Sequence, residues 1–79
     1  MKTSAQFLRI NEVIKFSNGL GTHTMMVENV QRCFKGKEVQ VSGTIIKTTN
    51  NGKCKISGVN VGDSYYNFFR VKTKVQIVK

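Results

Sequence analysis

The strongest constraint on the fold is a strict alternation of side chains near the C-terminus. Between residues 65 and 77 the odd positions are mostly apolar, whereas the even positions are aromatic, cationic or amide side chains. Successive side chains of a β-strand point to opposite faces of a sheet, so the pattern predicts one core face and one outer face. Residues 64–78 are therefore predicted to form one bent strand or two short ones. The core set is Tyr65, Asn67, Phe69, Val71, Thr73, Val75 and Ile77, and the outer set is Tyr66, Phe68, Arg70, Lys72, Lys74 and Gln76.

Residues 37–57 predict a β-hairpin. Apolar and polar residues alternate on both sides of Asn50-Asn51-Gly52, which is a favoured turn sequence. A four-residue loop would place Ile45 opposite Ile56, whereas a two-residue turn would place Lys47 opposite Ile56. We favour the first register because it pairs an apolar residue with an apolar residue.

The N-terminal half predicts helices. From Thr24 to Lys35 the apolar residues recur at helical spacing, and Gly36 follows as a stop signal. The segment 4–17 fits a helix or a strand that turns at Asn18-Gly19, and we favour the helix because Glu12 interrupts the alternation. The apolar residues of the 24–35 helix are Met26, Val27, Val30, Cys33 and Phe34.

Helices followed by strands predict an α+β fold. We expect a single domain over residues 1–79, with a curved antiparallel sheet over about residues 37–78. Helices over about residues 4–17 and 24–35 would cover one face of this sheet. The alternative is a small all-β barrel of the OB or SH3-like type with one helix.

Two segments resemble known families. The run from Leu8 to Thr24 resembles the helix-turn-helix opening of small phage excisionases and prophage regulators, with one extra residue at Asn18. That resemblance implies that residues 24–35 form a recognition helix. The spacing Phe34-x-Gly36-Lys37-x-Val39-x-Val41-x-Gly43 is similar to the first strand of small oligonucleotide-binding barrels.

The chain is strongly basic. It has 13 Lys and Arg against 4 Asp and Glu in 79 residues, which gives a net charge of +9. We expect no signal peptide, membrane span, cofactor or metal, and a cytoplasmic location in which Cys33 and Cys54 stay reduced. The titratable residues form no catalytic spacing, so we expect no enzymatic activity. These residues are His23, Glu12, Glu28, Glu38, Asp63 and the two cysteines.

Rings and cations on one strand face predict a nucleic-acid-binding surface, because bases stack on rings and cations follow phosphates. Lysines beside the 50–52 turn would form a second contact. Edge-strand lysines also prevent strand pairing, and a helix could bury the rings, so a purely structural role is the alternative. The rival function is a phage or mobile-element inhibitor that docks its basic face on an acidic host protein. The predicted site residues are Lys47, Lys53, Lys55, Tyr66, Phe68, Arg70, Lys72 and Lys74.

Overall fold

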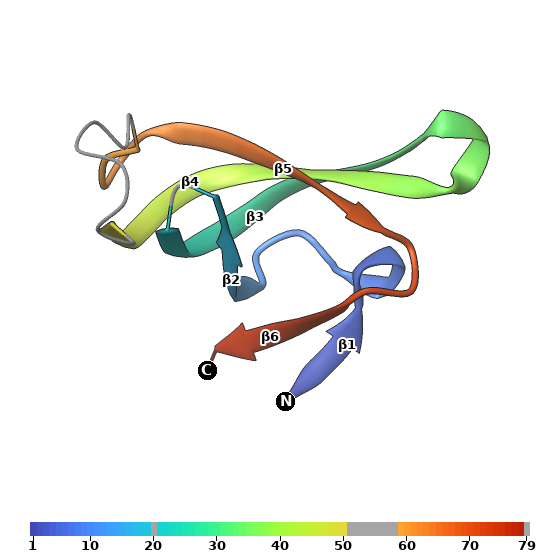
Figure 1. Ribbon diagram of the computed structural model, residues 1–79, viewed down its shortest axis with the longest axis horizontal. Coiled ribbons are helices and arrows are strands. Elements are labelled where there is room, and N and C mark those ends of the chain that lie inside the picture. Colours follow the sequence, from blue (N-terminus) through green and yellow to red (C-terminus); the bar gives the residue numbers. More distant parts are fainter. Residues whose placement is uncertain (20, 51–58, 79) are drawn as a thin grey trace.

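The described residues fold as one antiparallel sheet of six strands in the order β1-β6-β2-β3-β4-β5 (Figure 1). The structure is a computed structural model, and it describes residues 1–19, 21–50 and 59–78. Two short 3-10 helices lie between strands. The strands are β1 (Lys2–Ser4), β2 (Val13–Asn18), β3 (Gly21–Cys33), β4 (Glu38–Asn50), β5 (Ser64–Arg70) and β6 (Lys74–Val78), and the 3-10 helices are η1 (Ala5–Phe7) and η2 (Phe34–Gly36).

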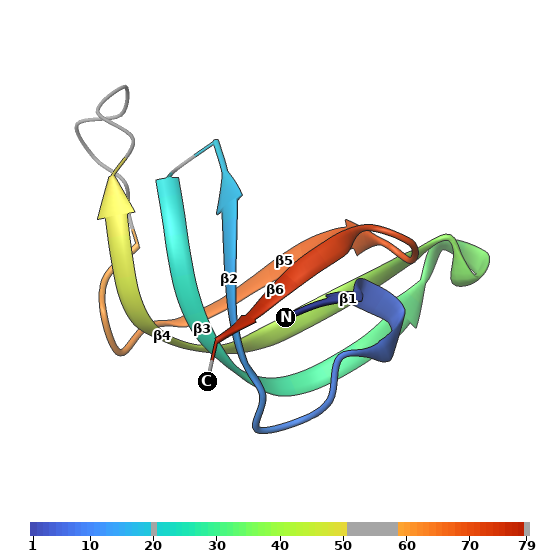
Figure 2. The ribbon, with the colours of Figure 1, turned by 90° about the horizontal axis from the view of Figure 1, so that it is seen from below.

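The two longest strands, β3 and β4, are bent, and the bend curls the sheet around its own core (Figure 2). Their pairing register shifts twice, between Thr24 and Met25 and between Val27 and Asn29. Such β-bulges bend a strand and increase its twist. The curled sheet therefore encloses apolar side chains on its inner face without a covering layer of helices.

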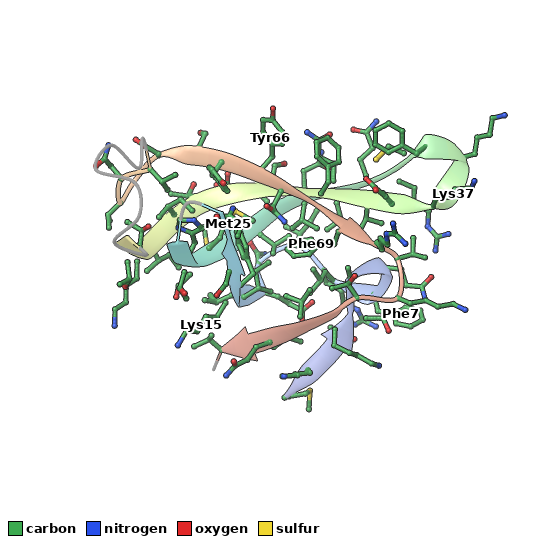
Figure 3. All side chains as sticks on the ribbon, in the orientation of Figure 1. Phe7, Lys15, Met25, Lys37, Tyr66 and Phe69 are labelled. Atoms are coloured by element: carbon green, nitrogen blue, oxygen red, sulfur yellow. The ribbon has the colours of Figure 1, made fainter. Side chains whose placement is uncertain are left out.

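The core consists of the side chains that point inward from all the longer strands and from the N-terminal segment. Figure 3 shows Met25 and Phe69 directed into this interior. Phe16 meets Phe69 edge to face, with ring centroids 5.4 Å apart. The buried apolar residues are Ala5, Leu8, Ile14, Phe16, Met25, Val27, Val39, Val41, Ile45, Val59, Phe69 and Val75.

The helix predicted over residues 24–35 is wrong, because this segment belongs to β3 and ends in η2. The extra residue of the bulge at Glu28 reverses the alternation, so Val27 is buried and Val30 also packs against the core. Inward residues three positions apart imitate the helical spacing. The recognition helix that the excisionase resemblance implies is therefore absent.

The helix predicted over residues 4–17 is also wrong. Only Ala5–Phe7 form a single 3-10 turn, and Val13–Asn18 form β2 with Ile14 and Phe16 buried. The strand alternative is correct for this part, since β2 pairs with β3 as far as Asn18 opposite Gly21. The predicted α+β fold is therefore wrong, because the structure is an antiparallel sheet without helical cover. The alternative, an all-β barrel with one helix, is wrong in its helix. The described residues contain no helix of seven or more residues.

The predicted pairing of Ile45 with Ile56 involves a residue that lies outside the described part of the chain. Ile45 pairs with Met25 of β3, and on its other side its backbone exchanges hydrogen bonds with Gly62 and Asp63. Lys47 pairs with Thr24. The predicted turn at 50–52 and the strand after it fall on residues 51–58, which lie outside the described residues. The stretch 39–43, similar to the first strand of oligonucleotide-binding barrels, lies in β4, the fourth strand here.

The alternation predicted for residues 65–77 is confirmed except at Thr73, which the pattern assigns to the core face but which is exposed. Phe69 and Val75 are buried, whereas Tyr66, Phe68 and all the even-numbered positions up to Gln76 are exposed. Residues 71–73 form a turn that divides the segment into β5 and β6.

Within the described ranges, no helix has the length and apolar character needed to cross a membrane.

Candidate nucleic-acid interface

Three exposed aromatic side chains form a continuous surface, which we call the aromatic surface, made of Tyr66, Phe68 and Phe34. Tyr66 and Phe68 point outward from β5, and Figure 3 shows Tyr66 directed away from the body of the protein. The ring centroids of Tyr66 and Phe68 are 5.7 Å apart, and those of Phe68 and Phe34 are 5.9 Å apart. The three side chains are 56%, 45% and 62% exposed in the same order. The predicted helical cover does not exist, so their burial beneath it is excluded.

Phe34 reaches this surface because the turn between β3 and β4 is left-handed. Phe34, Lys35 and Gly36 have φ angles of 52°, 55° and 82°. A left-handed conformation costs a bulky residue roughly 1–2 kcal/mol, although it suits glycine. The Lys37 amide donates a hydrogen bond to the Phe34 carbonyl at 3.1 Å and closes the turn. Phe34 is not identifiable as a site residue from the sequence, because its spacing places it on the apolar side of a predicted helix.

Cations from β5, from the turn that follows it and from the β3–β4 turn gather beside the aromatic surface. Lys37, Arg70 and Lys72 are exposed and line a groove of about 700 Å³, which we call the cationic groove. The Val71 amide donates to the Lys37 carbonyl at 3.3 Å and holds the two segments together. Glu38 is the acidic residue on the groove wall. The groove therefore has a net positive charge and can hold an anion such as a phosphate.

The structure brings together four of the eight predicted site residues, namely Tyr66, Phe68, Arg70 and Lys72. Lys74 begins β6, where its Nζ lies 3.4 Å from Ser4 Oγ, and it shares a second groove of about 640 Å³ with Arg70. Lys47 lines a different groove of about 530 Å³ with Lys15. The remaining two, Lys53 and Lys55, lie outside the described residues.

His23 belongs to the core of the protein. It is fully buried on β3, and its ring lies 5.5 Å from Phe16 and 5.4 Å from Tyr65, centroid to centroid. Asn18 Nδ2 donates to Tyr65 Oη at 2.7 Å, so Asn18 Oδ1 is left to accept from His23 Nε2 at 3.1 Å. With Nε2 protonated, the neutral ring accepts at Nδ1 from Thr48 Oγ1, which lies 2.7 Å away.

We expect acid to destabilise the fold through His23. Burial lowers the pKa of the folded His23 ring, because desolvation disfavours its charged form. Below the unfolded-state value of about 6.5, the unfolded chain binds more protons, so the free energy of unfolding falls as the pH decreases. The chain has 1 His, so an NMR titration of its ring protons is unambiguous. The expected midpoint lies below about 6.5, and a midpoint at or above that value would contradict the buried neutral ring.

Comparison with models of protein families, with curated proteins and with solved structures finds no match to this chain.

Proposed function

We propose that the protein is a non-enzymatic nucleic-acid-binding protein whose binding surface is the aromatic surface together with the cationic groove. The observation that carries the proposal is that one strand, β5, presents Tyr66 and Phe68 next to Arg70 on its outer face. The β3–β4 turn adds a further ring and a further cation at the same end of the molecule. Rings can stack on bases while the neighbouring cations neutralise phosphates.

The net charge of +9 supports an anionic partner. Like charges in so small a domain repel one another and destabilise the compact state, so a large excess of cations is favourable mainly when an anion neutralises it. Nucleic acid supplies closely spaced phosphates, and each phosphate contact releases condensed counterions irrespective of the base sequence. We therefore propose binding that depends on charge and stacking rather than on a defined base sequence.

The affinity for mixed-sequence DNA or RNA is expected to fall steeply with salt. A log–log plot of the association constant against salt concentration should show a slope that corresponds to about four or more phosphates, or about −3 and steeper for a single strand. Fluorescence anisotropy with a labelled oligonucleotide at several salt concentrations measures this slope. A flat response, or no binding at low salt, would contradict the proposal.

The rival function is docking of the same cations on an acidic protein. Nucleic-acid binding and docking on an acidic protein are distinguished by a pull-down from a lysate with and without nuclease treatment. Recovery of nucleic acid that is lost after nuclease supports the proposal. A protein retained after complete removal of nucleic acid, together with a flat salt response in the binding assay, would favour the rival.

A further inference from the structure

We infer that the aromatic surface receives unpaired bases, so that the protein binds single-stranded nucleic acid more tightly than duplex. The inference rests on the proposed function and adds the class of nucleic acid. It depends on three features of the described residues: the exposure of the rings, their spacing, and their continuity with the cationic groove.

The rings are arranged so that their faces remain available. Tyr66 and Phe68 meet at an interplanar angle of 82°, and Phe34 and Phe68 meet at 56°. An edge-to-face contact covers part of one face of one ring, so these rings overlap less than they would in a parallel stack. The ring surface that stays exposed can accept the face of a base, and every base has such a face.

The rings are also spaced as successive platforms. Tyr66 and Phe68 are two positions apart on one strand, which separates their Cα atoms by about 7 Å. Phe34 continues the row on the far side of Phe68. Beyond Phe68, β5 leads directly to Arg70 and the cationic groove. A flexible strand can lay its bases on the rings while its backbone follows the cations, whereas the bases of a duplex are already stacked inside the helix.

The backbone of Phe34 gives independent support. Its left-handed conformation is costly for a side chain of this size, and the side chain gains little burial in return because 62% of it remains exposed. Backbone strain of this kind is concentrated at functional sites. The structure thus holds a large ring in solvent, beside two other exposed rings, at the positively charged end of the sheet.

The test compares Phe34→Ala with Phe7→Ala. The two phenylalanines are 62% and 63% exposed, and Phe7 belongs to η1, which Figure 3 shows to be away from Tyr66. Anisotropy at low salt measures binding to a labelled oligodeoxythymidylate of about 12 nucleotides and to its duplex with oligodeoxyadenylate. The wild type is expected to prefer the single strand. Phe34→Ala should weaken single-strand binding by about 5-fold or more and leave duplex binding within about 2-fold. Phe7→Ala should change neither.

Thermal unfolding of both variants checks that the fold is retained. Equal wild-type affinity for the two probes would overturn the inference, and so would equal losses of single-strand affinity in Phe34→Ala and Phe7→Ala. Neither result would contradict the salt-dependent binding that the proposed function requires. Failure of the wild type to bind either probe at low salt would instead remove the proposed function itself. The two failures are therefore distinguishable in one set of titrations.

Discussion

Replacing Phe69 with alanine is expected to destabilise the fold by about 3–5 kcal/mol, because it removes a buried ring and leaves a cavity. Phe69 is 9% exposed and packs edge to face on Phe16. A domain of 79 residues has a total stability of only about 4–12 kcal/mol, so this loss is a large fraction of the total and should lower the unfolding midpoint markedly. Thermal or urea unfolding followed by circular dichroism measures the effect.

Phe68→Ala is the matched control, because Phe68 precedes Phe69 on β5 but points to the opposite face. It is 45% exposed and contacts the rings of Tyr66 and Phe34. The loss of these contacts should cost about 1 kcal/mol or less. Equal destabilisation by the two substitutions would mean that both faces of β5 are covered and that the aromatic surface does not exist.

Replacing Gly43 with alanine is expected to destabilise the protein by about 2–4 kcal/mol, for a steric reason. Gly43 lies on β4 opposite Val27, next to the bulge that bends β3. A Cβ atom added at this position would overlap the backbone carbonyl oxygen of Met26. Relief of this overlap requires movement of the backbone, because the obstructing atom does not belong to a flexible side chain.

Gly19→Ala provides the control for Gly43→Ala, since a Cβ atom at Gly19 would meet no atom within 4 Å. Chemical denaturation should therefore show near-wild-type stability for Gly19→Ala and a much lower midpoint for Gly43→Ala. A Gly43→Ala protein as stable as the wild type would show that the strands do not approach this closely at the bulge.

The β5–β6 region was predictable because alternation over a long stretch has only one structural explanation. The same alternation places Phe68 and Phe69 on opposite faces of the strand. The β3 strand was misread because a bulge is invisible in a hydrophobic pattern. One additional residue at Glu28 makes Val27 and Val30 face the same side, which is also what a helix does.

The site was predictable only in part, for a related reason. The exposed side chains of β5 follow from the alternation in the sequence. The position of the Phe34 ring depends instead on a left-handed turn, which no residue type in Cys33-Phe34-Lys35 signals. The hydrogen bonds of His23 likewise depend on pairing with Thr48, which lies 25 residues away in the sequence. Local sequence patterns identify which side chains share one face of a strand. Pairing between distant segments determines which other residues lie beside them.

The most direct test of the nucleic-acid-binding proposal compares the salt slopes of two triple variants that lose the same charge. One replaces Lys37, Arg70 and Lys72 of the cationic groove with glutamine, and the other replaces the exposed Lys2, Arg9 and Lys15. Each is expected to retain stability to within about 0.5 kcal/mol per site. Loss of the groove cations should reduce the magnitude of the slope by about 2–3, because each lost phosphate contact removes nearly one counterion. The control triple should reduce it by less than about 1. Equal slopes for the two variants, or a larger loss in the control, would contradict the location of the binding surface.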